Sequence, residues 1–342
     1  MKTRVAMLHG PGDIRIQPAD IMPVGPNDVA IHVAISGICG TDLHYWDGWQ
    51  FDAWFPEKPG PWVPGHEFTA VVQEVGSAVD DLTPGDPVVV EPGIPCDDCP
   101  SCERGRPNFC MNRLNLMRGG WADHVVINRR HITTLPPGTD LVVASLTEPL
   151  ACVLRGYDRV AVAPGDTVFI AGSGPIGLLA LQVAKSQLAG QTIVSEPNAA
   201  RRSVADQLGA DCILDPTNDD VVSTVRDMTK GFGADLCIEA AGANTAFSSC
   251  LSTVRDAGTV LVLSVGNPAT KFELRPFDLF AHELAIVGSN TRLHTFHRAL
   301  ELIPNLNAEP IITHTFDLDD AVEAINTAKS GAGAKVVFDF RI

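Results

Sequence analysis

Four cysteines in the first half of the chain stand at spacings that suit a metal ion. They are Cys96, Cys99, Cys102 and Cys110, and they fall within fifteen residues of a chain that has nine cysteines in all. An odd count with this clustering favours thiolates held for a metal over a disulfide framework. Four sulfur ligands fill the tetrahedron that zinc prefers, so we predict a structural zinc with no position for water. An iron–sulfur cluster and empty reduced cysteines are the alternatives.

A second set of metal-ligating residue types comes from two separate loops. Cys39 follows an apolar stretch at 29–35, and His66 and Glu67 precede another at 69–75. A thiolate, an imidazole and a carboxylate can hold zinc and leave a coordination position for water or substrate. Each residue type alone is more often structural, so the spacing by itself leaves a catalytic and a structural interpretation open.

A glycine-rich turn lies near the middle of the chain, between a predicted strand at 167–171 and a predicted helix at 176–188. Its Gly-x-Gly-x-x-Gly spacing allows a tight turn, a close approach of a pyrophosphate to the backbone, and packing of the helix on the strand. The N-terminus of the helix offers free N–H donors to phosphates. The residues that we predict to bind a dinucleotide here are Gly172, Gly174, Pro175, Ile176 and Gly177.

The choice between NAD and NADP depends on the end of the next predicted strand, at 192–195. Glu196 follows that strand, nineteen residues after Gly177. An acidic side chain there can accept both ribose hydroxyls of NAD and would repel the additional phosphate of NADP. Arg201 and Arg202 either form a solvated helix face, or Arg201 packs near the adenosine and Arg202 allows some use of NADP. The sequence favours NAD.

The elements that position these residues differ between the two halves of the chain. From about residue 164, short strands alternate with helices, which is typical of a parallel sheet with helices on both faces. The first 150 residues are rich in proline and turn residues and contain short β-branched runs, which predicts an irregular β-rich domain. The tail from about residue 287 has the pattern of a strand, a helix and a strand, and this pattern is compatible with either domain.

The overall composition excludes several classes of protein. The chain has 342 residues, 45% hydrophobic and 19% charged, which rules out intrinsic disorder. Asp and Glu number 41 against 25 Lys and Arg, for a net charge of -16, so we expect neither nucleic-acid nor membrane partners. No apolar run reaches the roughly 18 to 20 residues of a membrane span, and the first residues lack a secretory pattern, so we expect a cytoplasmic protein.

Four motifs in this order resemble the zinc-dependent medium-chain dehydrogenase/reductase family. They are Gly-Ile-Cys-Gly-Thr-Asp-Leu-His at 37–44, Pro-Gly-His-Glu at 64–67, the four cysteines and the glycine turn. The resemblance implies an α/β protein: a GroES-like distorted β-barrel catalytic domain at 1–150, a doubly wound Rossmann domain at 151–286, and a tail at 287–342 that returns to the catalytic domain. It also implies two zinc ions per chain, one catalytic and one structural, NAD, and a homotetramer or homodimer.

The resemblance assigns Cys39 and His66 as ligands of the catalytic zinc. It implies that Glu67 either binds this zinc directly or moves into and out of its coordination shell. The sequence Thr-Glu-Pro-Leu at 147–150 is similar to the Glu-Pro-Leu motif of the polyol (sorbitol/xylitol-type) branch. In that branch Glu148 would lie beside the zinc and ligate it directly or through water.

The resemblance also implies the chemistry. Zinc would act as a Lewis acid on the alcohol, and the nicotinamide would accept a hydride. Thr41 and His44 match the positions of the family's proton relay, and an imidazole suits this role because its unperturbed pKa lies near 6.5. A non-enzymatic member of the family would have lost its zinc ligands, and Cys39, His66 and Glu67 are all present.

The substrate is the least determined part of the site. Aromatic side chains crowd the segment between the first two zinc motifs, where they either line a pocket or simply pack: Tyr45, Trp46, Trp49, Phe51, Trp54, Phe55 and Trp62. By family position, Trp121 and Leu116 are further candidates for the pocket wall.

One departure from the polyol branch affects the choice of substrate. The arginine that binds a substrate hydroxyl in that branch falls on Thr291 here, with Arg292 one residue later. The resemblance therefore implies a secondary alcohol, such as a polyol, sugar or cyclitol. Trp-Asp-Gly-Trp at 46–49 is similar to threonine dehydrogenases, so an amino alcohol is the alternative.

Overall fold

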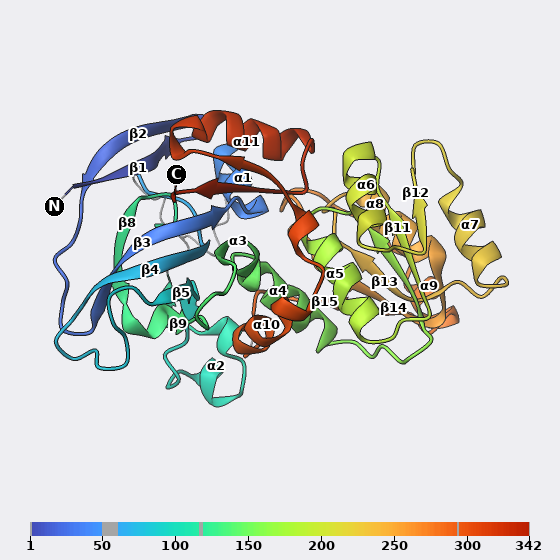
Figure 1. The fold of residues 1–342 in the computed structure, drawn as a ribbon. Helices are drawn as coiled ribbons and strands as arrows, with labels where there is room; N and C mark the ends of the chain where they lie inside the picture. The colour runs from blue at the N-terminus through green and yellow to red at the C-terminus, as the bar shows by residue number, and fades with distance from the viewer. Residues whose placement is uncertain (1, 50–60, 116–118, 293, 342) are drawn as a thin grey trace. The chain divides into compact units, whose positions relative to one another are not determined.

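The computed structural model describes residues 2–49, 61–115, 119–292 and 294–341. The predictions for Phe51, Trp54, Phe55 and Leu116 therefore lie outside the described residues. The chain divides into two compact units (Figure 1). The first unit comprises Met1–Glu148, Ile312–Ser330 and Lys335–Ile342, and the second comprises Pro149–Ile311 and Gly331–Ala334. Among the described residues, no helix is both long and apolar enough to cross a membrane.

The first unit is built on a seven-stranded sheet whose main path runs β16-β17-β3-β4-β5-β9, with β8 paired to β3. The strands are β3 (Asp28–Gly37), β4 (Glu67–Val75), β5 (Pro87–Val90), β8 (His124–Asn128), β9 (Ile132–Thr134), β16 (Ile312–Phe316) and β17 (Lys335–Asp339). Two smaller pairs are β1 (Lys2–Gly10) with β2 (Asp13–Asp20) and β6 (Gly93–Ile94) with β7 (Leu114–Asn115). Alternate residues of β3 point into the core, where Val29, Ile31 and Val33 are fully buried.

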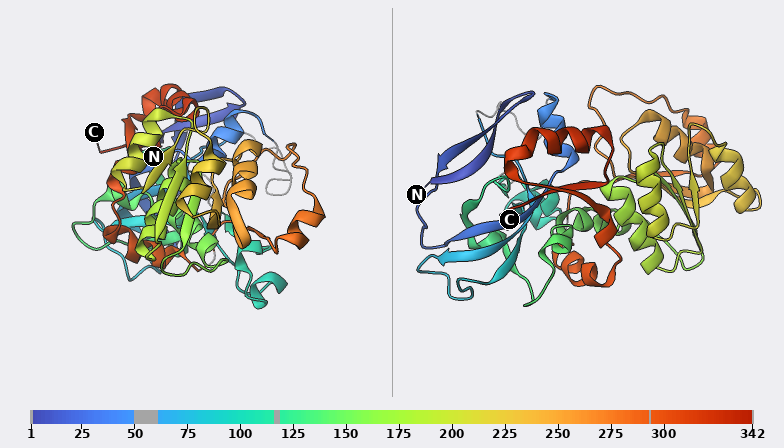
Figure 2. Two further views of the ribbon diagram at one scale, coloured as in Figure 1. Left: turned by 90° about the vertical axis from the view of Figure 1, so that its right-hand side faces the viewer. Right: turned by 45° about the horizontal axis from the view of Figure 1, so that its top comes forward.

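Short helices connect and cover the strands of the first unit. They are α1 (Gly40–Trp46), α2 (Pro100–Glu103), α3 (Leu141–Ala144), the start of α4 (Thr147–Tyr157) and α11 (Ala321–Ser330), with 3-10 turns at Pro107–Phe109, Arg129–His131 and Leu318–Asp320. Helix α11 packs on β16 and β17 (Figure 2). It buries Ala321, Ala324 and Ile325 in the same core as β3.

The second unit is a six-stranded parallel sheet in the order β12-β11-β10-β13-β14-β15. Its strands are β10 (Thr167–Ala171), β11 (Gln191–Ser195), β12 (Cys212–Leu214), β13 (Ala234–Glu239), β14 (Val254–Val262) and β15 (Ala285–Gly288). Its helices are α5 (Pro175–Ser186), α6 (Ala199–Gln207), α7 (Val221–Met228), α8 (Asn244–Thr253), α9 (Pro276–Ala281) and α10 (Phe296–Leu302), with 3-10 turns at Ile303–Asn305 and Glu309–Ile311.

In the second unit, β11 and β12 follow β10 in order toward one edge of the sheet, and β13 then begins a second series on the other side of β10. Right-handed connections then place α5 and α6 on one face of the sheet and α7 and α8 on the other (Figure 2). The reversal falls between the neighbouring strands β10 and β13, and ligands of doubly wound sheets bind at this point. The predicted Rossmann architecture is confirmed.

The boundary predicted at residue 286 lies too early. Strand β15 pairs in parallel with β14, from Thr259 with Ala285 to Val262 with Gly288, and so completes the sheet of the second unit. Helix α10 also belongs there, because the Thr295 hydroxyl before it donates a hydrogen bond of 2.7 Å to the carbonyl of Ala151. The chain re-enters the first unit only at Ile312, and residues 331–334 again belong to the second.

Candidate active site

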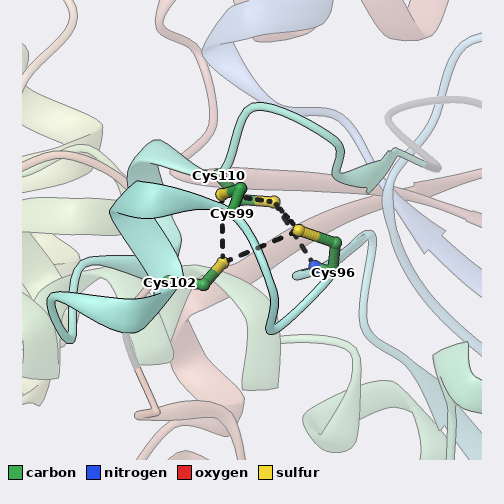
Figure 3. A group of neighbouring side chains, drawn as sticks. All are labelled: Cys96, Cys99, Cys102 and Cys110. Carbon is green, nitrogen blue, oxygen red and sulfur yellow. Dashed lines mark hydrogen bonds between the residues drawn. The ribbon is translucent and has the colours of Figure 1, made fainter.

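The four predicted cysteine ligands converge on one point (Figure 3). Four sulfur–sulfur distances, including Cys96 to Cys110 at 3.4 Å and Cys96 to Cys102 at 4.0 Å, lie between 3.4 and 4.0 Å. Zinc–sulfur bonds of about 2.3 Å in a regular tetrahedron would place the sulfurs roughly 3.8 Å apart. The four thiols therefore fit a structural zinc.

Local hydrogen bonds separate the acidities of these thiols. The backbone N–H of Met111 is the main cause that lowers the pKa of Cys99 to about 6, whereas the contact with Asp98 raises the pKa of Cys96 to about 12. A thiol with so high a pKa is protonated at neutral pH unless a cation replaces its proton. Zinc bound by these four thiols would therefore displace protons.

The second group of candidate metal ligands lies where two neighbouring strands meet. Cys39 caps α1 two residues after β3, and Glu67 begins β4, directly after His66. The antiparallel register pairs Gly37 of β3 with Glu67. As a result, one ligand atom of each of Cys39, His66 and Glu67 lies within 4.8 Å of the other two, so all three can reach one ion.

The electrostatics of this group favour a bound cation. Burial lowers the pKa of His66, but the Cys39 sulfur and the Asp42 carboxylate outweigh burial and raise that pKa well above its usual value. Burial, reinforced by Glu67, raises the pKa of Cys39. Asp42 accepts the backbone N–H of Cys39 at 2.9 Å, and its Oδ1 lies 3.6 Å from Nδ1 of His66. The donor set therefore fits zinc, with Asp42 placed to orient the imidazole.

A buried lysine that the sequence analysis missed completes the surroundings of Glu67. Nζ of Lys335 forms an ion pair with Oε2 of Glu67 and donates to the carbonyl of Ile38 at 3.0 Å. Although burial lowers the pKa of Lys335, the charges of Glu67 and Cys39 raise it, so the amine is charged at neutral pH. Gly37 leaves the necessary space: a Cβ there would lie 2.6 Å from Cε of Lys335 and 2.7 Å from Oε2 of Glu67.

The predicted relay residues lie on α1, whose N-cap is the candidate ligand Cys39. Thr41 is buried and His44 is half-buried, and their spacing of three residues places them on neighbouring parts of the helix surface. Burial lowers the pKa of His44. Its ring stacks on Trp49, with centroids 3.9 Å apart, and Tyr45 meets Trp62 edge-on at 4.7 Å. Trp46, the remaining described aromatic residue of this segment, packs against the hydrophobic core of the first unit.

Three other predicted residues are buried in different surroundings. Glu148 lies in the first turn of α4, outside the group of three ligands, so its role at the zinc stays a prediction. Trp121 is 1% exposed and packs edge-on against Phe338, which is a core position rather than an exposed pocket wall. Arg292 is buried after β15 in the second unit. The substrate roles of Tyr45, Trp121 and Arg292 stay predictions.

The glycine turn of the second unit has the geometry that dinucleotide binding requires. Gly172 has a positive φ of 102°, and a Cβ there would lie 2.9 Å from that of Ala241, across the reversal point. A Cβ at Gly177 would lie 1.9 Å from the carbonyl oxygen of Gly172, whereas one at Gly174 would meet no atom within 4 Å. Gly174 is the N-cap of α5, with Pro175 at its first turn, and makes no side-chain cap. The backbone is therefore open to a phosphate at this helix end.

Glu196 is held directly beneath this turn. Its Oε2 accepts the Ser173 N–H at 2.8 Å, and its Oε1 accepts the Asn198 N–H at 2.9 Å. Arg201 donates through Nε to the carbonyl of Gly333 at 3.0 Å. Arg202 donates to the backbone carbonyl of Glu196 at 2.7 Å.

Fold and site together define a class: a zinc-dependent alcohol dehydrogenase that uses a nicotinamide cofactor. A family model for an alcohol dehydrogenase GroES-like domain matches residues 25–137, and one for a zinc-binding dehydrogenase matches residues 175–305. The chain is 32% identical over 342 residues to sorbitol dehydrogenase of Macaca fascicularis (97% of this chain, 94% of the relative). It is 36% identical over 329 residues to L-threonine 3-dehydrogenase of Pyrococcus horikoshii (93% of each chain).

A solved structure of a putative zinc-binding dehydrogenase from Sinorhizobium meliloti, bound to NADP, has a TM-score of 0.91 and 33% identity over 99% of both chains. The chain belongs to the zinc-dependent medium-chain dehydrogenase/reductase family, in its polyol branch.

Proposed function

We propose that the protein oxidises a secondary alcohol of a polyol, sugar or cyclitol to the ketone, with NAD as the hydride acceptor. The observation that carries this proposal is the convergence of Cys39, His66 and Glu67 in a chain similar along nearly its whole length to sorbitol dehydrogenases. Cys39 and His66 would hold the catalytic zinc. When bound, zinc supplies Lewis-acid polarisation of the alcohol oxygen.

The residues of α1 are proposed to carry the proton away. The hydroxyl of Thr41 would take up the alcohol proton and pass it to the imidazole of His44. Because burial lowers the pKa of His44, the imidazole is neutral at neutral pH and can accept it. The nicotinamide, when bound at the glycine turn, would supply a hydride acceptor, so that one alcohol would give one ketone, one reduced cofactor and the one proton that Thr41 and His44 carry away.

The surroundings of Glu196 support NAD over NADP. Its carboxylate is buried beneath the turn, where a ribose hydroxyl can donate to it and a ribose phosphate would be repelled. Arg202, the cation that would have favoured NADP, is bound elsewhere: its NH2 lies 3.1 Å from Oδ2 of Asp215, and its NH1 donates to the carbonyls of Glu196 and Pro197 at 2.7 Å.

An amino alcohol such as threonine is the second candidate substrate. The 36% identity to the Pyrococcus horikoshii threonine dehydrogenase favours it. A screen of the zinc-loaded protein with sorbitol, xylitol, a cyclitol and L-threonine, following the absorbance of reduced nicotinamide, decides between the two. Oxidation of threonine alone would reject the polyol proposal, and oxidation of none of them would reject both.

A homodimer or homotetramer is also proposed, formed along the edge of the parallel sheet. Strand β15 ends this sheet, and the neighbouring α9 exposes Phe277 and Phe280, at 68% and 82%. Light scattering coupled to gel filtration measures the mass. Replacing both phenylalanines by serine is expected to lower it, and a wild-type mass of about 36.4 kDa, that of one chain, would reject the proposal.

A further inference from the structure

We propose that His32 and His124 form a further metal site in the first unit, for a divalent transition-metal ion such as nickel(II), copper(II) or zinc(II). Neither histidine belongs to the two groups of candidate ligands described above. The site requires neither the alcohol nor the nicotinamide cofactor, so this inference stands independently of the proposed function.

Strand pairing brings the two imidazoles together. Strands β3 and β8 are antiparallel, and His32 stands directly opposite His124 in their register. Side chains at directly opposed positions have Cβ atoms about 4.5–5.5 Å apart and point to the same face of the sheet. The ring centroids are 4.9 Å apart, and the ring planes are tilted by 38°. Both residues are half-buried, so an ion can reach them from solvent.

The pair lies on the face of the sheet opposite the core. Ile31 and Val33, the neighbours of His32 on β3, are fully buried in the core of the first unit, and Ile127 of β8 is buried in the same core. Because successive side chains of a strand point to opposite faces, His32 and His124 both point away from this core. The two imidazoles therefore do not serve to fill it.

Hydrogen bonds determine which nitrogen of each ring carries the proton. Nδ1 of His32 lies 2.8 Å from the backbone carbonyl oxygen of Asp123, and Nδ1 of His124 lies 2.9 Å from Oε1 of Gln73. Both oxygens are acceptors only, so each Nδ1 donates and each Nε2 keeps its lone pair. Histidines that bind a metal usually donate their second ring nitrogen to a carbonyl or carboxylate oxygen in this way. Both rings are thus prepared to ligate through Nε2.

A β-bulge supplies Gln73, the partner of His124. Two successive residues of β3 pair with Val72 and Glu74 of β4, which leaves Gln73 between them as an additional residue. A bulge changes the direction of the side chain that it adds. Strand β3 lies between β4 and β8, so the amide of Gln73 reaches across β3 to the ring of His124. The irregular register therefore has a role if this ring must be held in one orientation.

The charges around the pair suit a cation with imidazole ligands. Burial lowers the pKa of His124, and His32 lowers it further, whereas the carboxylate of Asp123 raises it. The imidazole of His124 is therefore neutral at neutral pH, as a ligand must be. The Asp123 carboxylate is paired with Arg4 at 3.1 Å, which leaves the other coordination positions to water. Imidazole suits nickel, copper and zinc.

Two protein ligands would hold the ion less tightly than the four cysteines hold theirs. We therefore expect this ion to exchange readily and to leave the protein during desalting. The site would then add nothing to the zinc content of the desalted protein.

A purely structural role for the pair makes a different prediction. The rings could simply connect β3 with β8. Replacing either histidine would then lower the thermal stability and leave metal binding unchanged. If the two imidazoles share an ion, either replacement removes its binding. Added metal would then raise the unfolding temperature of the wild type and not that of the variants, because an ion that binds only the folded chain stabilises it.

The experiment is equilibrium dialysis of zinc-loaded, desalted protein against nickel(II). Metal analysis counts both nickel and zinc per chain, so that displacement of zinc is detected. The variants are H32Q, H124Q and Q73A. The control is H9Q, which replaces a half-buried histidine of the same unit whose Nε2 lies 2.9 Å from Oε1 of Gln17. Thermal unfolding without nickel confirms that each variant is folded, and unfolding with nickel measures the stabilisation.

For the wild type we expect one nickel ion per chain with unchanged zinc content, and an unfolding temperature that rises with nickel concentration. H32Q and H124Q should each lose this nickel ion and the rise in unfolding temperature, whereas H9Q should keep both. Q73A should still bind one nickel ion, with an affinity about ten- to hundredfold weaker, because the ring of His124 is no longer held in place.

Three results would overturn the inference. They are no nickel bound to the wild type, wild-type nickel binding in H32Q or H124Q, and loss of the nickel ion in H9Q. If a histidine variant does not fold, Q73A decides, since a folded Q73A with the nickel affinity of the wild type would show that the ring of His124 is not a ligand. None of these measurements needs a substrate, so failure of the polyol proposal would appear separately, as absence of turnover.

Discussion

Replacing Glu196 with alanine is expected to raise the use of NADP relative to NAD by at least about tenfold. The structure separates two effects of this change. The carboxylate accepts the backbone N–H groups of Ser173 and Asn198, so its loss disturbs the phosphate-binding turn for both cofactors. The proposed hydrogen bonds of Glu196 to the ribose hydroxyls would be made with NAD alone, and a hydrogen bond to a charged group contributes about 1.5–3 kcal/mol.

The ratio of the affinities for NADPH and NADH isolates the loss of the ribose contacts. The disturbance of the turn weakens the binding of both cofactors alike, so it cancels in this ratio. At about 1.4 kcal/mol for each factor of ten, the lost ribose contacts alone change this ratio roughly ten- to hundredfold. The assay is titration of the protein with NADH and NADPH, followed by kcat/KM for both oxidised cofactors.

Glu239 provides a matched control for this prediction. It lies at the end of the neighbouring strand β13, is also buried, and accepts the N–H groups of Ala241 and Gly242 at 2.9 and 2.7 Å. E239Q should lower stability and leave the cofactor ratio unchanged. A ratio in E196A that stays within about twofold of the wild type would refute the ribose role of Glu196.

Three further outcomes are expected. C39A and H66A should each abolish turnover while NADH still binds, and activity in either variant freed of metal would contradict the Lewis-acid role. Metal analysis should find two zinc ions per chain. In C102S the number should fall to one, because the variant removes a sulfur that lies 3.6 Å from that of Cys99. Two zinc ions in C102S would exclude the four-cysteine site. Because burial lowers the pKa of His44, the imidazole accepts protons at neutral pH and loses this capacity as pH falls through that lowered pKa. The acid limb of kcat should therefore lie below about pH 6.5, and an unchanged limb in H44Q would assign it to another group.

The parts of the site that sequence could predict are those whose residues are close in the chain. The glycine turn, from Gly172 to Gly177, lies between one strand and one helix, and local spacing alone determines its geometry. The four cysteines converge because a short loop carries them. A structural role could be predicted for them because four sulfur ligands fill the tetrahedral coordination of zinc and leave no position for water.

The parts that sequence could not predict depend on pairing between distant segments. Lys335 and Glu67 are 268 residues apart, and nothing local to either residue indicates their contact. The signal that could have found it is a lysine within a strand whose neighbours Val336 and Val337 are fully apolar. The boundary at Ile312 was missed for a similar reason: β15 has the pattern of any short strand, and only its pairing with β14 assigns it to the second unit.

The position of β17 has a consequence for the order in which the protein can assemble during synthesis. This strand lies between β16 and β3, yet its residues leave the ribosome after the whole of Pro149–Ile311. The parallel sheet can therefore form while the other sheet still lacks an interior strand. Until residues 335–339 emerge, β3 has an open edge and Glu67 has no buried cation beside it, so this half of the nascent chain is the one most exposed to aggregation and to chaperones.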